Sequence, residues 1–295
     1  MHSIFGIPTP ALFGQLLLGL INGAFYAMLS LGLAVIFGLL NVVNFSHGAF
    51  YMLGAFTGWL LLAGLGLGYW WALLLSPLIV GVLGMAVERL LLARLKGLDP
   101  LYGLLLTFGL ALIIQGVFRN IFGVSGLPYG VPSQLAGARN LGFMILPNYR
   151  GWVIGLSLLV CLATWLGIEK TRLGATLRAA TENATLTEAF GINVPRLVTL
   201  TYGFGTALAA LAGVLAAPIY SVNPNMGADL IITVFVVVVI GGMGSILGSI
   251  VTGFGLGLAE GLTRLVYPAG SATVVFVIMI VVLLVKPAGL FGRST

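Results

Sequence analysis

Long apolar runs dominate the chain, and short polar stretches separate them. Each run is close to the roughly 20 residues that a helix needs to cross the hydrocarbon core of a bilayer. A spanning β-strand would instead alternate polar and apolar residues over about ten positions. We therefore expect an all-α, polytopic transmembrane helix bundle of about 8–10 membrane segments. The segments lie near residues 12–40, 45–65, 69–92, 102–121, 151–168, 197–217, 229–241, 246–266 and 272–286.

Three of these segments are irregular. The first is long enough to tilt or to break near Asn22 and Gly23, and the second follows it almost immediately at residue 45. The segment 229–241 is short. Transporters use short or glycine-interrupted segments as discontinuous helices beside a translocation path. These places are where we expect such a path.

Composition excludes an ordinary soluble domain. Hydrophobic residues make up 60% of the chain and charged residues 7%, against about a quarter charged in soluble proteins. The non-apolar stretches do not exceed about 30 residues, too short for a soluble domain, so we expect a single transmembrane domain over residues 1–295. Small residues at four-residue spacing, at 205–213 and 253–261, predict close helix packing. The lone Cys161 provides neither a disulfide nor a cysteine metal site within the chain.

The basic residues predict the orientation in the membrane. Cytoplasmic loops carry an excess of Lys and Arg, which favours an outside N-terminus and a cytoplasmic C-terminus. Four basic residues would then lie outside, mostly in a periplasmic loop at about 122–150: Arg119, Arg139, Arg150 and Arg264. The others would lie inside: Arg89, Arg94, Lys96, Lys170, Arg172, Arg178, Arg196, Lys286 and Arg293. Because they are dispersed among loops, the net charge of +6 does not indicate nucleic-acid binding.

A charged stretch interrupts this mostly apolar chain at about 169–196. It holds Glu169, Lys170, Arg172, Arg178, Glu182, Glu188 and Arg196. A weak apolar stripe predicts a short helix over 173–190 on the cytoplasmic face, with Gly191 as a C-cap and Asn193 and Pro195 starting the next helix. A solvated loop is the alternative, but an ordered loop of this length is more often functional. We expect it to contact a soluble partner.

Enzymatic chemistry has little support in the sequence. The pattern G-x-x-x-x-G-K-[ST] is absent, so the chain has no P-loop for a nucleotide. The glycines of GGMGSILG, residues 241–248, lie between two membrane segments and predict a tight interhelical turn. Two His and seven acids are too scattered for a metal site or a general acid/base pair. We expect no cofactor in this chain.

A few polar residues and turn glycines at membrane depth are candidates for the translocation path. His47 either satisfies backbone carbonyls at a helix break or contacts substrate. Glu260 either forms an ion pair with Arg264, four residues on, or faces a cavity. The asparagines of YSVNPNMGADL, residues 220–230, form either a plain turn or a pore mouth. The full candidate set is Asn22, Asn44, His47, Asn223, Asn225, Gly242, Gly244 and Glu260.

Several long motifs carry a family resemblance over nearly the whole chain. They are LINGAFYAMLSLGLAVIFGLLNVVNFSHGAFYMLGAF (20–56), LLTFGLALIIQG (105–116), AFGINVPRLVTLTYGFGTALAALAGVLAAPIYSVNPNMG (189–227), VVVVIGGMGSILGSIVTGFGLGLAEGL (236–262) and LLVKPAGLFGR (283–293). The chain resembles the permease subunits of ABC importers for branched-chain and other hydrophobic amino acids, of the LivH type. Ser46 and Ala49 depart from the family pattern N-F-A-H-G-acid.

The resemblance implies a heteromeric importer in a bacterial inner membrane. Its partners would be a second related permease, two cytoplasmic ATPases that bind ATP and Mg, and a periplasmic substrate-binding protein. It also implies the ABC importer permease fold and a cytoplasmic coupling helix with an E-A-A…G consensus. TEAFG matches this with Glu188, Ala189 and Gly191, and Arg178 and Glu182 lie in the same stretch.

Two other functions stay open at this point. Related permeases transport urea, short amides, or aromatic and other carboxylic acids. A protein of a different class, an ion-coupled secondary transporter working alone, would need ionisable groups at the membrane midplane. Most of the apolar segments offer almost none.

Overall fold

The computed structural model describes residues 3–4, 7–40, 43–142 and 144–292. Arg293, expected on the cytoplasmic side, and two residues of the first resemblance motif lie outside this part of the chain.

Each predicted membrane segment is a helix. Within the described residues, seven helices are long and apolar enough to cross a membrane: α1 (Thr9–Leu40), α2 (His47–Leu65), α3 (Tyr69–Leu90), α4 (Pro100–Phe122), α5 (Asn148–Glu169), α8 (Val194–Tyr220) and α10 (Ile246–Val266). Two apolar helices are shorter: α9 (Met226–Gly241) and α11 (Val274–Val285). At 1.5 Å per residue their 16 and 12 residues reach about 24 and 18 Å, less than the bilayer core. The chain is a multi-pass membrane protein.

The remaining elements lie at the two ends of this bundle. Two short polar helices, α6 (Arg172–Glu182) and α7 (Ala184–Ala189), follow α5. The strands β1 (Ser3–Ile4) and β2 (Ile7–Pro8) form one antiparallel pair, and β3 (Ala138–Asn140) and β4 (Ile145–Pro147) form another, with Ala138 opposite Pro147. Single 3₁₀ turns are η1 (Leu92–Leu95), η2 (Ser133–Leu135) and η3 (Pro268–Gly270).

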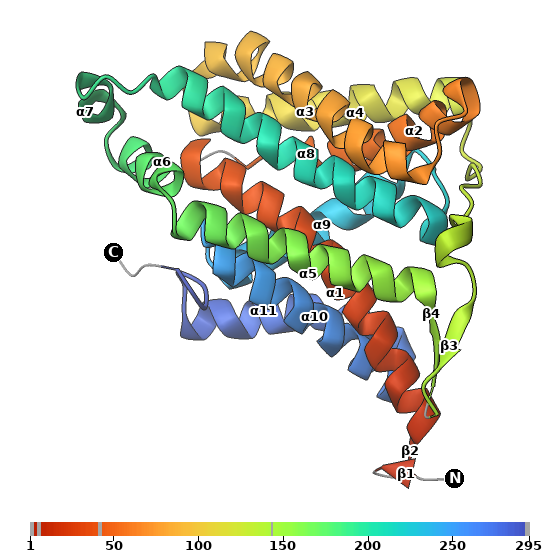
Figure 1. Ribbon diagram of the computed structural model, residues 1–295. Coiled ribbons are helices and arrows are strands. Elements are labelled where there is room, and N and C mark those ends of the chain that lie inside the picture. The colour runs from red at the N-terminus through yellow and green to blue at the C-terminus, as the bar shows by residue number, and fades with distance from the viewer. Residues whose placement is uncertain (1–2, 5–6, 41–42, 143, 293–295) are drawn as a thin grey trace.

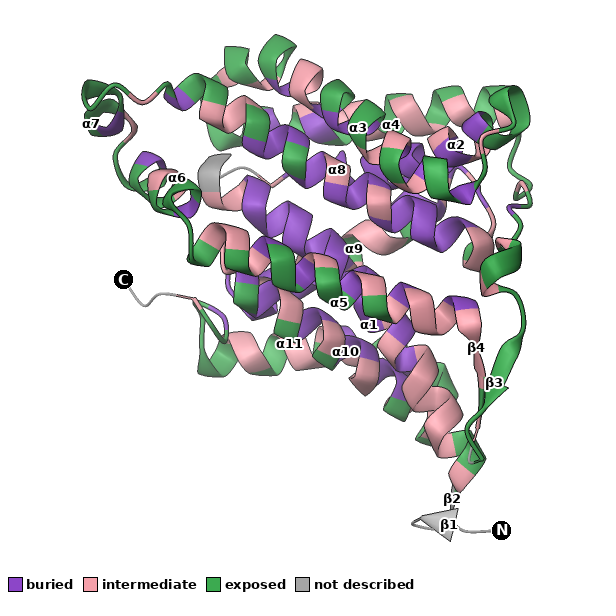
Figure 2. Ribbon diagram, in the orientation of Figure 1, coloured by how far each residue is buried: buried purple, intermediate pink, exposed green. Residues whose placement is uncertain are grey.

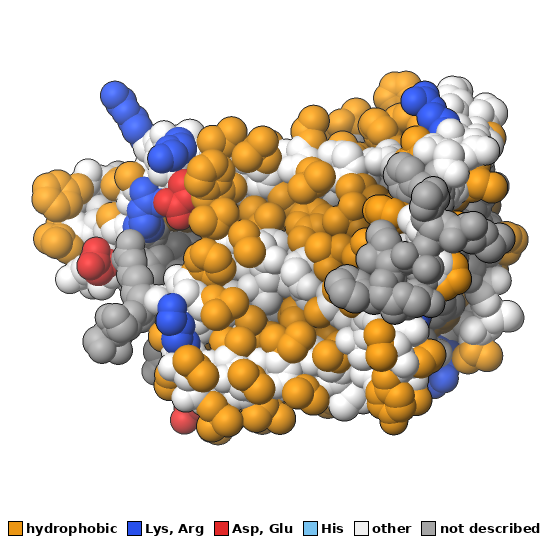
Figure 3. Space-filling view, turned by 90° about the horizontal axis from the view of Figure 1, so that it is seen from below, with side chains coloured by type: hydrophobic (Ala, Val, Ile, Leu, Met, Phe, Trp, Pro, Cys, Tyr) orange, Lys and Arg blue, Asp and Glu red, His pale blue; other side chains and the backbone are white. Residues whose placement is uncertain are grey.

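The arrangement has two distinct ends. In Figure 1 most of the long helices run roughly across the view, with α6, α7 and the C-terminus at the left. The N-terminus and the β3–β4 hairpin lie at the right. We call these the α6/α7 end and the hairpin end. In the view of Figure 3, apolar side chains cover the surface between the ends, and charged side chains gather mainly at the α6/α7 end. This distribution fits a belt facing lipid.

Local sequence explains where several helices begin. The Asp99 side chain accepts a hydrogen bond from the Leu101 N–H (2.9 Å) at the start of α4. The Asn193 side chain accepts one from the Arg196 N–H (3.0 Å), next to a proline in the first turn of α8. Such caps satisfy N–H groups that have no partner within the helix. The predicted start of α8 at Asn193 and Pro195 is therefore confirmed.

Glycine contacts hold the centre of the bundle together. α1 packs along α10 and α8, and Figure 2 shows the resulting buried stripe through the middle of the molecule. A Cβ added at Gly23 of α1 would lie 2.9 Å from the Cα of Phe254 on α10. A Cβ at Gly213 of α8 would overlap the carbonyl oxygen of Tyr51 on α2. The packing faces predicted at 205–213 and 253–261 are confirmed.

Candidate functional site

The chain breaks between α1 and α2, and buried polar side chains surround this break. Asn44 Oδ1 accepts hydrogen bonds from the backbone N–H (3.1 Å) and Oγ (2.5 Å) of Ser46. Asn44 Nδ2 donates to the hydroxyl of Tyr202 on α8 (3.0 Å), and the Phe45 N–H donates to Thr107 Oγ1 on α4 (3.2 Å). Non-helical backbone at membrane depth needs such partners. The break is thus tied to α4 and α8.

His47 begins α2 directly after the break. Its side chain is fully buried, and Nε2 lies at hydrogen-bond distance, 3.0 Å, from the carbonyl oxygen of Leu29 on α1. The ring also packs where a side chain at Gly32 would stand. His47 is not among the residues that line the three cavities described below. This geometry corresponds to the carbonyl-satisfying role considered for it.

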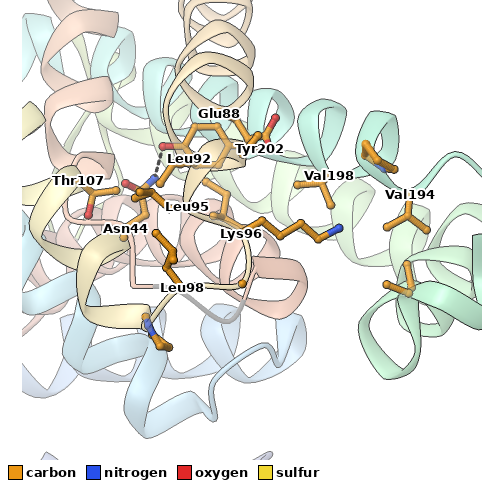
Figure 4. A pocket seen from close by; sticks show the side chains of 18 of the residues that line it. Asn44, Glu88, Leu92, Leu95, Lys96, Leu98, Thr107, Val194, Val198 and Tyr202 are labelled. Carbon is orange, nitrogen blue, oxygen red and sulfur yellow. Dashed lines mark hydrogen bonds between the residues drawn. The ribbon is translucent and has the colours of Figure 1, made fainter.

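Asn44 and Thr107, beside the break, line a cavity of about 430 Å³, which we call the Tyr202 cavity. It lies between the 92–100 connection and the start of α8. Apolar side chains such as Leu92 and Val198 form much of its wall. Figure 4 shows the Lys96 side chain extending across it toward α8, and the Asn44–Tyr202 hydrogen bond. The cavity joins the helix break to the α6/α7 end.

A buried carboxylate belongs to the same cavity. Glu88 of α3 is 4% exposed, and its Oε2 accepts a hydrogen bond from Thr199 Oγ1 of α8 (2.6 Å). A buried acid needs such a partner to offset its lost hydration. The bond links α3 to α8 beside the cavity.

A second cavity, of about 470 Å³, lies toward the hairpin end, and we call it the Arg150 cavity. Two predicted residues, Asn22 of α1 and Asn223, line it together. Asn22 Oδ1 accepts a hydrogen bond from the Tyr220 hydroxyl (2.8 Å). Three charged side chains also line it: Arg150 of α5, Asp229 of α9 and Arg264 of α10.

Glu260 is hydrogen-bonded to two residues that line this second cavity. One carboxylate oxygen accepts a bond from Arg264 Nη2 (2.6 Å), which is the i,i+4 ion pair considered from the sequence. The other accepts from the Tyr26 hydroxyl (2.8 Å). Tyr26 itself lines the cavity. Glu260 therefore holds two side chains of the cavity wall in place, those of Tyr26 and Arg264.

The N-termini of α2 and α9 meet inside the bundle. Gly48 and Gly227 touch backbone to backbone, since a Cβ at either one would overlap the other's carbonyl oxygen. Beside them lies a small cavity of about 80 Å³, lined in part by Gln115 of α4. Gln115 Nε2 donates to Asn225 Oδ1 (2.9 Å). Asn225 thus tethers the start of α9 to α4.

Gly242 and Gly244 lie in the turn between α9 and α10, apart from these cavities. Their φ angles, 97° and 82°, are in the left-handed region that favours glycine. A Cβ at Gly242 would come within 2.5 Å of the Gly292 backbone nitrogen. The Ser245 N–H closes the turn on the Gly242 carbonyl oxygen (2.9 Å). The predicted tight interhelical turn is confirmed.

The predicted helix over 173–190 is wrong in one respect, because it is two helices. Asn183 has extended backbone (φ −152°, ψ 96°), and its side chain accepts a hydrogen bond from the Leu186 N–H (2.9 Å). An asparagine that caps a new helix in this way competes with continuation of the previous one. Gly191 follows α7 with φ 85°, as expected of a residue ending a helix.

The α6–α7 segment (residues 172–190) presents both charge and apolar surface. Arg178 Nη1 lies 3.4 Å from Glu169 Oε2. Glu182, Glu188 and Ala189 are exposed. Leu186 and Phe190 are 56% and 78% exposed, and we call these two residues the apolar tip. Two large apolar side chains are therefore exposed beside the charged residues of this segment.

Sequence reasoning missed several residues of these cavities. Thr107 and Tyr202 are polar side chains inside apolar runs, and that irregularity was the available signal. Arg150 and Asp229 were visible only as loop or helix-end charges. Thr107, Tyr202 and Arg150 lie on helices distant in sequence from the asparagines beside them, whereas Asp229 lies six residues after Asn223.

Comparisons with known proteins all point to one family of membrane transport proteins. Residues 15–285 match the family described as "Branched-chain amino acid transport system / permease component". The chain is 31% identical over 292 residues, 95% of each chain, to the high-affinity branched-chain amino acid transport system permease protein BraD of Pseudomonas aeruginosa. It is 29% identical over 296 residues, 95% of each chain, to the corresponding permease protein LivH of Escherichia coli K12.

A more distant relative is the permease protein LivM of Salmonella typhimurium. It is 28% identical over 246 residues, which cover 75% of this chain and 57% of that protein. No solved structure matches the chain significantly.

Proposed function

Because this chain belongs to the family of branched-chain amino acid transport permease components, we propose that it is the membrane-spanning permease subunit of an ATP-driven ABC importer. Its substrates are branched-chain or related hydrophobic amino acids. The observation that carries this is the family match over residues 15–285, together with full-length similarity to BraD. The cavities supply apolar walls with a few amides and charges, which suits such substrates.

A second, related permease completes the membrane part of the importer. The chain is similar to both LivH and LivM, two differently named permease proteins of one transport system. α4 and α11 present many exposed large apolar side chains, among them Leu105, Leu112 and Ile280. Such helices either face lipid or pack against another membrane subunit. A heterodimer is the arrangement we propose.

The α6–α7 segment couples this subunit to cytoplasmic ATPases. Its apolar tip would enter a groove on the ATPase, and Arg178, Glu182 and Glu188 would meet polar groups at the rim. Ala189 and Gly191 would let the two backbones approach closely. ATP and Mg²⁺ bind on the two ATPase subunits, and this chain contributes no catalytic group or cofactor.

The orientation follows from the same assignment. The α6/α7 end and the C-terminus face the cytoplasm of a bacterial inner membrane, and the N-terminus and the β3–β4 hairpin face the periplasm. The concentration of charged side chains at the α6/α7 end supports this orientation. A periplasmic binding protein would deliver substrate at the hairpin end, near the Arg150 cavity.

Reconstitution tests the proposal. The chain is co-expressed with a candidate second permease and candidate ATPases from the same genome, placed in proteoliposomes, and supplied with a candidate periplasmic binding protein. We expect ATP-dependent uptake of radiolabelled leucine or isoleucine, and none when the P-loop lysine of the ATPases is replaced. Uptake confined to strongly polar solutes, or uptake driven by an ion gradient without ATP, would contradict the proposal.

A further inference from the structure

The Arg150 cavity brings charges of both signs to one place. Arg150 comes from the first turn of α5, Asp229 from the first turn of α9, and Arg264 from the last turn of α10. Charged side chains are rare in this protein, at 7% of residues. Three helices therefore place scarce charges around a single space of about 470 Å³, a volume typical of small-molecule sites.

These three charged side chains differ in whether they already form an ion pair. Arg264 is paired with Glu260 at 2.6 Å, and the Tyr26 hydroxyl holds the second oxygen of that carboxylate. Among the described residues, no ion pair engages Arg150 or Asp229. The cavity is thus left with one uncommitted guanidinium and one uncommitted carboxylate. This combination is complementary to a molecule that carries one negative and one positive charge.

The rest of the lining suits an apolar group. Leu18 and Phe25 of α1 and Leu230 of α9 face the same space. The amide oxygen of Asn22 accepts a hydrogen bond from the Tyr220 hydroxyl, which links α1 to the end of α8 in the cavity wall. A ligand with a charged head and a hydrocarbon side chain would meet charges on one side and apolar surface on another.

We propose that the Arg150 cavity is a binding site for the zwitterionic head of an amino acid, an inference that rests on the proposed function. Arg150 binds the α-carboxylate, for which the planar guanidinium fork is well shaped. Asp229 binds the α-ammonium group. The Glu260–Arg264 pair fixes the outer wall, and the apolar residues of α1 and α9 receive the side chain.

A competing explanation exists for Asp229 alone. A carboxylate in the first turn of a helix stabilises that helix through its dipole, and Asp229 lies in the first turn of α9. That role predicts a change in stability only. The zwitterion site predicts a change in which ligands bind, so ligand chemistry separates the two.

The experiment uses the full chain in lipid nanodiscs and equilibrium dialysis against three radiolabelled probes. The probes are leucine, 4-methylpentanoate, which lacks the ammonium group, and 3-methylbutylamine, which lacks the carboxylate. We expect Asp229→Asn to lower the affinity for leucine and for 3-methylbutylamine by about 10- to 100-fold, the usual range for losing a charge-assisted hydrogen bond. The affinity for 4-methylpentanoate should stay unchanged. Arg150→Gln should lower the affinity for leucine and for 4-methylpentanoate and leave the affinity for 3-methylbutylamine unchanged.

Two further variants serve as controls. Arg139→Gln removes a charge from β3, at the same end but outside the cavity lining, and should change no affinity. Asp229→Glu keeps the charge and should retain leucine binding. Equal weakening of all three probes in a variant, unchanged affinities, or no leucine binding by the wild type would overturn the site. Leucine uptake by the complete importer is measured separately, so the proposed function stands or fails independently.

Discussion

Replacing Gly257 by alanine tests whether direct backbone contact holds α1 against α10. A Cβ at this position would overlap the N and Cα atoms of Gly23 and the carbonyl oxygen of Gly19. All three are backbone atoms, so no side chain can rotate away to make room. The two helices would have to move apart.

The size of this effect follows from the contact geometry. Ordinary carbon–carbon contacts lie at about 3.5–4.0 Å, so relieving the overlap needs a separation of about 1 Å, which forfeits about a quarter to a half of each contact's dispersion energy. Overpacking generally costs about 1–3 kcal/mol, and rigid backbone neighbours place this variant in the upper part of that range. Helix propensity acts in the other direction, because alanine is favoured over glycine by about 1 kcal/mol.

Gly255→Ala on the same helix is the matched control. An added Cβ there meets no heavy atom within 4 Å in the part of the chain that the structure describes, so the variant gains helix propensity without overlap. The free energy of unfolding of both variants is measured by SDS titration in mixed micelles, followed by tryptophan fluorescence. We expect Gly257→Ala to be less stable than Gly255→Ala by about 2–3 kcal/mol. Equal unfolding free energies would refute the backbone contact between α1 and α10.

Three other predictions concern the coupling surface, the helix break and the hairpin-end loop. Glu188→Lys and Gly191→Pro should abolish co-purification with the ATPases while the chain still fractionates with membranes; normal ATP-driven transport by both would rule out this docking surface. Asn44→Ala should lower the unfolding free energy by about 1–3 kcal/mol, and by more than Tyr202→Phe, since only Asn44 also satisfies the Ser46 N–H. Thermal unfolding in detergent compares the two, and equal losses would count against that network. Burial raises the pKa of Tyr129 from 10.0 to about 12, and among the described residues its buried hydroxyl has no hydrogen-bond partner. The unfolded chain therefore releases this proton first, so the stability present below pH 10 falls between pH 10 and 12; Tyr129→Phe should be neutral or stabilising and lessen that fall, and a stability loss at neutral pH would contradict the burial.

The sequence predicted the helices well, because lipid leaves the backbone few choices. Segments such as 69–92 and 246–266 agree with α3 and α10 within a few residues. The glycine turn at 241–248 and the capped start of α8 were also readable, since both depend on local backbone geometry. The division of α6 from α7 was missed, although Asn183 is a good helix-capping residue.

The candidate site was harder to predict because its residues come from distant segments. Tyr26 and Glu260 form a hydrogen bond across 234 positions of sequence. Asn44 depends on Tyr202, which lies on another helix. An apolar run with an occasional polar residue looks the same whether that residue faces a cavity, a neighbouring helix or lipid.

The sequence by itself therefore determined the class of protein, its helices and its charged ends, because these depend on segment length and hydrophobicity. Only the tertiary structure decided which glycine faces meet and which polar side chains share a cavity. Those outcomes depend on how helices rotate and cross when they pack, and a rotation of one helix changes all of its partners. Arg150 and Asp229, far apart in sequence, line one cavity only because α5 and α9 pack around α1 in this way.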